Sequence, residues 1–311
     1  MMPNFSEPAP AGWLAFELSV LRRLRFRSVV NPLAGEPDLD AALKRWDARV
    51  AVNDPRQWAW IRGIARVENN AERLTEDDLA RLLEDVYVPG YRLRNPALAR
   101  RFGETDAWWF DNLRANADRL EGDVKQALAL SLGLAVGDYA RSFTAETREL
   151  RQPLSRVLRR LWEQSPAPFD NKQRNTAANK DPRQFLAEER ADLLFLRLPR
   201  AGANGTPQTA PAAWREEWVR TTDEFWPDYE RARAGKLDAR VETKQQYLRL
   251  VEELLAAATH IRTWAVAHAD AGLVTTEELV ETIRRVRKVE TIYTKDFSEL
   301  LGARAAIITS L

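Results

Sequence analysis

The sequence contains no cysteine and only two histidines, His260 and His268. The lack of cysteine excludes disulfide bonds, a zinc–thiolate site and a cysteine nucleophile. It is compatible with the reducing conditions of the cytoplasm, where we expect the protein. Two isolated histidines without a nucleophile motif are expected to be core or strand-end residues rather than catalysts. They are too few for a histidine-rich metal site, and we expect no metal.

Long apolar runs and an excess of one charge are also missing. No stretch approaches the roughly 18 apolar residues of a membrane-spanning helix, and the opening MMPNFSEPAPAG lacks the basic start of a signal peptide. We therefore expect no membrane association. The 47 Lys and Arg nearly balance the 46 Asp and Glu, which gives a formal net charge of +1. A uniformly basic nucleic-acid-binding protein is not indicated, so any contact with DNA has to use local patches.

Apolar residues and tryptophan are plentiful. The 311 residues are 45% hydrophobic, which is enough for a sizeable core. Eleven tryptophans are present, several of them beside other aromatic residues. Because aromatic side chains dominate core burial, we expect most of them to anchor the core. Base stacking is the alternative.

Strand-like and helical segments alternate at both ends of the chain, whereas helical segments fill its middle. Strands are expected at 26–30, 48–54, 191–199, 261–270, 288–297 and 305–311, and helices at 12–25, 38–46, 182–190, 241–260 and 275–286. Asp38 or Asp40 is expected to cap the second helix. The link between the last two strands, SELLGAR, is short enough for an antiparallel hairpin.

The order of these segments predicts an α/β fold with a Rossmann-like sheet, mostly parallel with an antiparallel last strand, plus a helical insertion. Residues 1–60 and 166–311 would form the two parts of the α/β domain, and 61–165 the insertion. In the first part, Asp54 follows the turn glycine Gly35 by about 20 positions, a spacing typical of nucleotide-binding βαβ units.

Three features of the chain resemble the adenine-specific DNA methyltransferases, and within them the Dam-like group. They are the order of segments, NPLAGEP (31–37) followed by RVAVNDP (49–55), and NKDPRQFLAEERADLLFLRLP (179–199). The resemblance covers nearly the whole chain. Members of this family transfer a methyl group from S-adenosylmethionine to N6 of adenine, and their helical insertion recognises the target DNA.

The resemblance implies which residues would bind the cofactor. The first turn of the family reads F-x-G-x-G, and here Leu33 and Gly35 occupy the first two motif positions while Pro37 replaces the second glycine. Asp54 stands where an acidic residue would bind the ribose hydroxyls. Asp181 stands where another would meet the adenine side of S-adenosylmethionine.

The family's catalytic motif, [DNS]-P-P-[YFW], is not kept. Arg197, Leu198, Pro199 and Arg200 occupy its four positions. The amine of the target adenine must donate to an acceptor side chain, and arginine has only donors. The nearest acceptors are Asp192 and Asn204. The resemblance therefore implies a methyltransferase-like chain that has lost its catalytic residues.

Arginines remain as candidates for DNA binding. In the insertion these are Arg151, Arg156, Arg159 and Arg160, in the segment that lies against DNA in the family. Arg197 and Arg200 would either contact a phosphate or pair with Glu36, Asp54 or Asp181 and fill the vacated cofactor pocket. The sequence leaves both interpretations open.

The function expected from these features is that of a catalytically degenerate methyltransferase-like protein that acts as a DNA-binding or regulatory component. DNA is the expected partner, and a protein partner is compatible with this role. One alternative is an active S-adenosylmethionine-dependent DNA adenine-N6 methyltransferase with divergent motifs. Another is a structural protein-interaction module that binds neither ligand.

Overall fold

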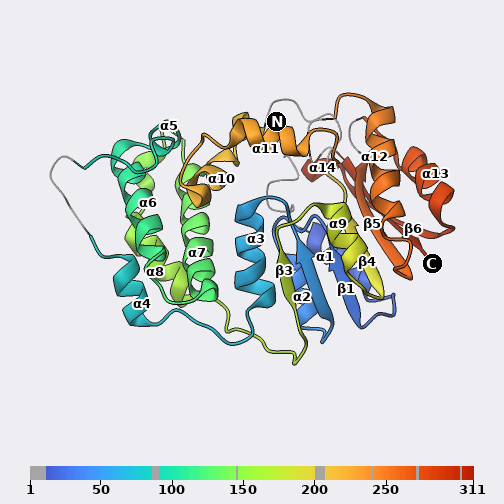
Figure 1. Cartoon of the computed structure of the whole chain (residues 1–311), viewed down its shortest axis with the longest axis horizontal. Coiled ribbons are helices and arrows are strands. Elements are labelled where there is room, and N and C mark those ends of the chain that lie inside the picture. The colour runs from blue at the N-terminus through green and yellow to red at the C-terminus, as the bar shows by residue number, and fades with distance from the viewer. Residues whose placement is uncertain are drawn as a thin grey trace.

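A seven-stranded sheet and a group of helices lie side by side in the computed structural model of the chain (Figure 1). The structure describes residues 12–85, 91–144, 146–199, 207–237, 239, 241–270, 273–301 and 303–311. The strands are β1 (Ser28–Asn31), β2 (Arg49–Asn53), β3 (Thr176–Ala178), β4 (Leu193–Arg197), β5 (Thr263–Asp270), β6 (Val289–Phe297) and β7 (Ala303–Ser310).

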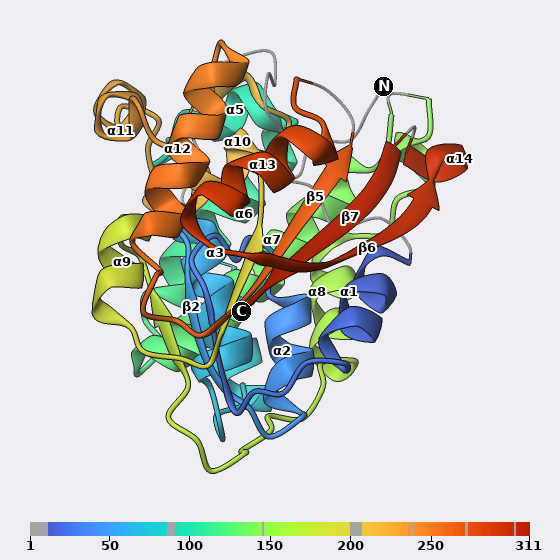
Figure 2. The same ribbon diagram turned by 90° about the vertical axis from the view of Figure 1, so that its right-hand side faces the viewer.

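The strand order is β3-β2-β1-β4-β5-β7-β6. All neighbouring pairs from β3 to β5 are parallel, and β7 runs antiparallel to both β5 and β6. Figure 2 shows β7 lying between β5 and the edge strand β6. The predicted fold class, a mostly parallel Rossmann-like sheet with an antiparallel last strand, is confirmed.

Helices cover both faces of the sheet because its central strands are apolar on both sides. One face packs against α1 (Trp13–Leu21) and α2 (Asp38–Lys44), and the other against α9 (Pro182–Glu188), α12 (Lys244–Ala256) and α13 (Thr276–Val286). In β4, Leu193 and Phe195 face the first layer, and Leu194 and Leu196 face the second. The continuous burial of this strand explains why it reads as an uninterrupted apolar run.

The helical half follows β2. Its elements are α3 (Gln57–Gly63), the π-helical turn η1 (Ile64–Glu68), α4 (Glu76–Leu82), α5 (Leu98–Arg101), α6 (Glu104–Ala117), α7 (Asp123–Arg141), the 3₁₀ turn η2 (Arg148–Leu150) and α8 (Leu154–Glu163). Helix α4 begins with the capping box formed by Thr75 and Asp78.

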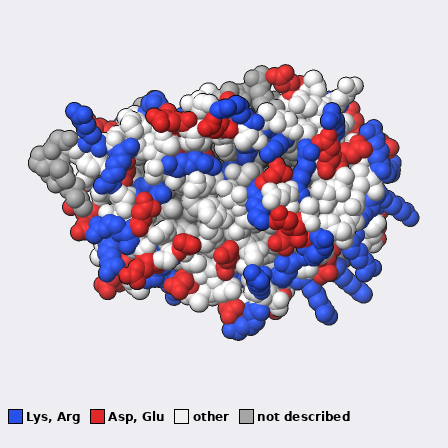
Figure 3. All heavy atoms as spheres, in the orientation of Figure 1, with Lys and Arg blue, Asp and Glu red and all other residues white. Residues whose placement is uncertain are grey.

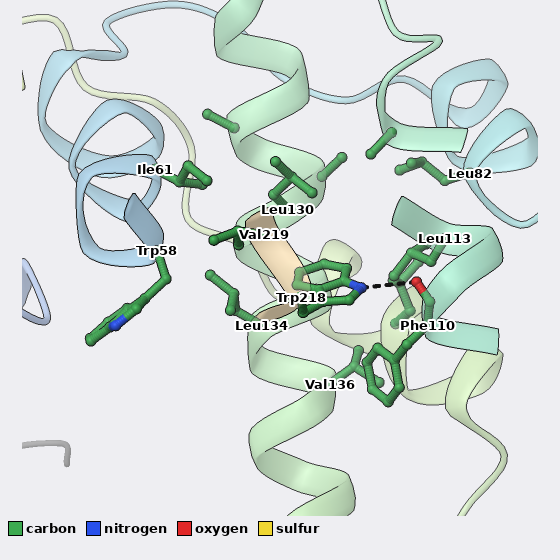
Figure 4. Close-up of a cluster of buried hydrophobic side chains, with 14 of the residues drawn as sticks. Trp58, Ile61, Leu82, Phe110, Leu113, Leu130, Leu134, Val136, Trp218 and Val219 are labelled. Atoms are coloured by element: carbon green, nitrogen blue, oxygen red, sulfur yellow. Dashed lines mark hydrogen bonds between the residues drawn. The ribbon is translucent and has the colours of Figure 1, made fainter. Parts of the chain in front are cut away.

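A segment from much later in the chain completes this helical half. After β4, the 3₁₀ turn η3 (Pro207–Thr209) leads to α10 (Ala213–Arg220) and α11 (Trp226–Arg233). Trp214 and Trp218 of α10 are buried in the same apolar cluster as residues of α6 and α7. Figure 4 shows Trp218 among Phe110 and Leu113 of α6 and Leu130 and Leu134 of α7. The indole Nε1 of Trp218 donates to the Phe110 carbonyl oxygen at 2.9 Å. This burial agrees with the expectation that tryptophans anchor the core.

Two glycines of α7 make room for these indoles. Gly133 and Gly137 are four residues apart, as are Trp218 and Trp214 on α10. A Cβ atom at Gly133 would overlap the ring of Trp218, and one at Gly137 would overlap the ring of Trp214. The two helices can approach this closely only because both positions lack a side chain.

The structure departs from the sequence-based expectations in several places. Strand β3, and helices α10 and α11, were not expected. The predicted cap of α2 is wrong: Pro37 occupies the N-cap position, and no side chain caps this helix. Asp40 is instead fully buried and accepts two hydrogen bonds from Asn31 Nδ2, both at 3.2 Å. One short helix, α14 (Ser298–Leu301), lies between β6 and β7.

Candidate functional site

The candidate site lies where β1, β2 and β4 end. Chain connections leave β1 and β4 in opposite directions along the sheet, and ligands of open α/β sheets bind in the crevice at such a switch point. The turn after β1 has Gly35 at φ +59°, a left-handed conformation that favours glycine. Its neighbour Ala34 donates to the Asn53 carbonyl oxygen at 3.0 Å. Leu33, the predicted hydrophobic cofactor contact, is buried in the core beside this turn.

Asp54 lies directly beneath this turn, as the nucleotide-type spacing predicted. Its Oδ2 accepts from the Gly35 N–H at 2.8 Å and from Arg56 Nη2 at 2.8 Å. Its Oδ1 accepts from the Arg56 N–H at 2.9 Å and from Arg56 Nε at 2.8 Å. Although burial opposes ionisation, the charge and hydrogen bonds of Arg56 lower the pKa of the Asp54 carboxyl. The Asp54 carboxylate is therefore ionised and accepts four hydrogen bonds.

Arg56 was not singled out in the sequence, yet its guanidinium lies beside the turn. Its Nη2 lies 3.5 Å from the position that a Cβ of Gly35 would occupy. Its guanidinium stands over the ring of Trp58, 5.1 Å from the centroid. The side chain is 25% exposed, and Nη1 has no hydrogen-bond partner among the residues that the structure describes. Arg56 therefore lies over the turn, with the N–H groups of Nη1 not used in any contact of the described residues.

A ring of four charged side chains ties the turn to the helical half. Glu36 pairs with Arg62 of α3 and, at 3.2 Å, with Arg215 of α10. Asp138 of α7 pairs with the same two arginines, at 3.1 Å and 2.8 Å. Both arginines are almost completely buried. The ring therefore joins four segments that are distant in the sequence.

Glu216 of α10 lies near Arg56 and near Tyr229 of α11. The Glu216 carboxylate accepts from the backbone N–H groups of Gln57 and Trp58, at 3.0 and 3.2 Å, at the start of α3. It also pairs with Arg220 at 2.7 Å. The guanidinium of Arg220 lies 5.7 Å from the ring centroid of Tyr229 on α11. Burial raises the pKa of Tyr229 to about 12. The negative charges of Glu216 and Asp54 also raise this pKa, whereas the positive charge of Arg56 lowers it.

The end of β4, where the family's catalytic motif would begin, carries no free acceptor side chain among the described residues. Arg197 turns toward α1 and makes a two-pronged ion pair with Glu17, with Nε–Oε1 at 2.9 Å and Nη2–Oε2 at 2.7 Å. Glu17 is fully buried and also accepts from Trp13 Nε1 at 2.7 Å. The partner of Arg197 is therefore none of the three carboxylates that the sequence suggested. Its cation is held inside the fold.

The residues after Arg197 are also engaged in the fold. Leu198 is buried, and the Pro199 carbonyl oxygen accepts from the Tyr247 hydroxyl of α12 at 2.6 Å. Arg200 and Asn204 lie outside the described residues. Asp192 is exposed at the opposite end of β4, where it accepts from the N–H groups that start β1. The expectation that Asp192 could supply an acceptor near the motif is wrong.

Asp181 caps α9 and does not reach the Gly35 turn in any contact of the described residues. It accepts from the N–H groups of Arg183 and Gln184 and pairs with Lys236 at 2.8 Å. The ion pair with Lys236 lowers the pKa of the Asp181 carboxyl, although partial burial opposes it. Lys236 follows α11, so this contact fastens the end of α11 to the sheet.

The four arginines of the insertion divide into two groups. Arg151 forks onto Asp106 at 2.6 and 2.7 Å and is largely buried, so it serves to join η2 to α6. Arg156 is exposed on α8. Arg159 is half exposed and pairs with Glu76 at 3.2 Å, and Arg160 donates to Gln152 Oε1 at 3.3 Å. Three basic groups therefore remain on the outer side of α8.

The surface as a whole carries mixed charge. Acidic and basic side chains are interspersed over most of the face in Figure 3, with basic ones most crowded at its lower right. Among the described residues there is no group of three or more His, Asp or Glu that could hold a metal ion. None of the described helices has the length and apolarity needed to cross a membrane.

The two histidines belong to the structural class that the sequence suggested. His260 contacts the Glu189 carbonyl oxygen through Nε2 at 2.8 Å, near the surface. His268 lies in β5, is 7% exposed, and burial lowers the pKa of its imidazole. Neither contacts the residues around the Gly35 turn in any bond of the described chain.

Comparison with known proteins adds no family to this description: no protein-family model and no curated protein matches the chain.

Proposed function

We propose that the chain is a methyltransferase-like protein that does not methylate adenine and that acts by binding DNA, as a regulatory component. The sheet supports this proposal, because its reversed β7 and the helical segment between β2 and β3 follow the segment order of the family that the sequence resembles. The turn at Gly35 with Asp54 at the end of β2 supports a nucleotide-type crevice.

One observation carries the loss of catalysis: the ion pair of Arg197 with Glu17. Adenine N6 becomes a better nucleophile when its amine donates to an acceptor at the end of β4. A guanidinium has no acceptor, and this one is also turned toward α1 by a buried carboxylate. Asp54, the carboxylate that accepts from the Gly35 N–H, has its acceptor positions occupied by Gly35 and Arg56. Neither the end of β4 nor Asp54 therefore offers a free acceptor to the amine.

Methyl transfer is tested with radiolabelled S-adenosylmethionine and unmethylated duplex DNA. We expect no incorporation above that of DNA incubated without protein. Incorporation that depends on the protein would refute the loss of catalysis.

DNA binding is tested by fluorescence anisotropy over a series of salt concentrations. The triple variant Arg156→Gln, Arg159→Gln and Arg160→Gln should bind DNA more weakly. Its salt dependence should be shallower by about 0.9 in slope for each phosphate that the variant no longer neutralises. Arg249→Gln on α12 is the matched control, since Arg249 is an exposed helical arginine paired with a carboxylate, Glu253.

Two outcomes would count against the proposed DNA surface. One is an unchanged salt slope in the triple variant. The other is an equal loss in Arg249→Gln, which would indicate a general effect of charge rather than a surface on α8.

A further inference from the structure

The end of β2 offers hydrogen-bond donors where nucleotide-binding folds commonly offer an acceptor. A carboxylate at this point usually binds ribose hydroxyls, which donate to it. A carboxylate has about four acceptor positions, and those of Asp54 are filled by the Gly35 N–H and by three donors of Arg56. An unmodified ribose therefore finds no acceptor at Asp54.

Arg56 replaces that acceptor with donors. A guanidinium has five N–H groups. Two of them, the N–H of Nε and one N–H of Nη2, donate to Asp54. Both hydrogens of Nη1 and the second hydrogen of Nη2 have no partner among the described residues, and the side chain is 25% exposed. The ion pair with Asp54 and the ring of Trp58 hold the guanidinium in one orientation. A fixed guanidinium of this kind matches the geometry of a phosphate group.

Arg220, the last residue of α10, adds a second guanidinium nearby, because it lies close to Glu216 and Tyr229, as Arg56 does. Arg220 uses Nε for Glu216, and its two terminal nitrogens have no hydrogen-bond partner among the described residues. Its guanidinium lies 4.8 Å from the ring centroid of Phe225 and 5.7 Å from that of Tyr229, and its side chain is 28% exposed. Each arginine is paired with one carboxylate, Asp54 or Glu216, but each also has terminal N–H groups without a partner among the described residues. Such donors suit the oxygens of an anion better than the positively charged sulfonium of S-adenosylmethionine.

We propose that the turn at Gly35 and the end of β2 bind a nucleotide whose ribose carries a phosphate on its 2′- or 3′-hydroxyl, with Arg56 as the residue that recognises this phosphate. The inference concerns this region alone and holds whether or not α8 contacts DNA.

Isothermal titration calorimetry with the full chain tests the proposal. The ligands are adenosine 2′,5′-bisphosphate, adenosine 3′,5′-bisphosphate, S-adenosylmethionine and, as the matched ligand without a phosphate on its 2′- or 3′-hydroxyl, adenosine 5′-monophosphate. Hydrogen bonds to charged groups are strong enough that one of the bisphosphates should bind about tenfold or more tightly than the monophosphate. Equal affinities, or tighter binding of S-adenosylmethionine than of either bisphosphate, would overturn the proposal.

Variants assign the preference to Arg56. In Arg56→Gln the preference for a bisphosphate should disappear, and in Arg56→Lys, which keeps the charge without the planar fork, it should shrink. Arg119→Gln, at an exposed ion pair with Glu84 in the helical half, is the control and should keep the full preference. Circular dichroism of each variant checks that it is folded. A preference that persists in folded Arg56→Gln would show that another group binds the phosphate.

A competition experiment distinguishes a free nucleotide from the phosphates of DNA. Duplex DNA is added to the complex of the protein with the better bisphosphate. The proposal expects the nucleotide to stay bound while DNA binds elsewhere. Displacement of the nucleotide by DNA, together with weaker DNA binding in Arg56→Gln, would assign Arg56 to the DNA backbone and overturn the proposal.

Discussion

Asp40→Asn should stabilise the protein at neutral pH and do so less at acid pH. Asp40 is fully buried in α2, where its carboxylate accepts from Asn31. The nearby charge of Arg197 lowers the pKa of this carboxyl, and that of Glu17 raises it. Burial raises the pKa of the Asp40 carboxyl from 3.8 to about 6. The folded state therefore holds a proton more tightly than the unfolded chain, and the ionised carboxylate of Asp40 costs stability. Asparagine fills the same space and cannot ionise.

The expected size follows from the two pKa values. The shift of 3.8 to about 6 corresponds to a penalty of about 3 kcal/mol when the group is ionised in both states, as at pH 8. At pH 5 the unfolded chain is already ionised while the folded one is mostly protonated, and the penalty is about 2 kcal/mol. It vanishes below the unfolded pKa. The contribution of Asp40 to stability thus falls as the pH rises from about 4 to about 6 and is constant above that.

The assay is urea denaturation of both proteins at pH 5 and pH 8, followed by circular dichroism. The advantage of Asp40→Asn should be larger at pH 8 by about 1 kcal/mol. Asp38→Asn serves as the control, because Asp38 lies in the same helix but is exposed and pairs with Arg66. An advantage that is the same at both pH values, or that appears equally in Asp38→Asn, would refute the assignment of the penalty to the buried carboxylate.

Two further substitutions test the packing and the ion pair described above, by the same denaturation assay. Gly137→Ala should destabilise the protein by about 1–3 kcal/mol, because a methyl group there overlaps the indole of Trp214. Ser131→Ala on the same helix should be nearly neutral, and equal losses in the two variants would contradict the packing argument. Arg197→Ala should cost about 3–5 kcal/mol, because it leaves the buried Glu17 without its cation. Replacing both by glutamine should restore part of this loss, and a loss below about 1 kcal/mol in Arg197→Ala would show that the pair is not structurally important.

The sequence predicts the parts of the fold that depend on local pattern. The apolar run ending at Arg197, the spacing of Asp54 from Gly35 and the short link before β7 each indicate their structural role without knowledge of the partners. Strand β3 escapes prediction because it has only three residues, Thr-Ala-Ala, and each is half buried. Its pairing with β2, and not its own composition, makes it a strand.

The candidate site is harder to predict because its key contacts join distant residues. Glu17 lies 180 positions before Arg197, and many carboxylates of the chain could have been its partner. One signal was present: Glu17 is the only acid in the otherwise apolar helix WLAFELSVL, and a buried acid needs a partner. The contact of Arg56 with Asp54 was easier to predict, because Arg56 follows Asp54 by two residues in the loop after β2.

The packing of α10 against α7 has a consequence for how this chain can be divided. The helical half is not one continuous cassette, because its core includes two tryptophans from a connection that leaves the sheet after β4. Excising residues 61–165 would leave the helices with an empty groove over Gly133 and Gly137, and the remaining sheet with two exposed indoles. If this half were exchanged between related chains, the α10 segment would have to be exchanged with it, because the two stretches share one core.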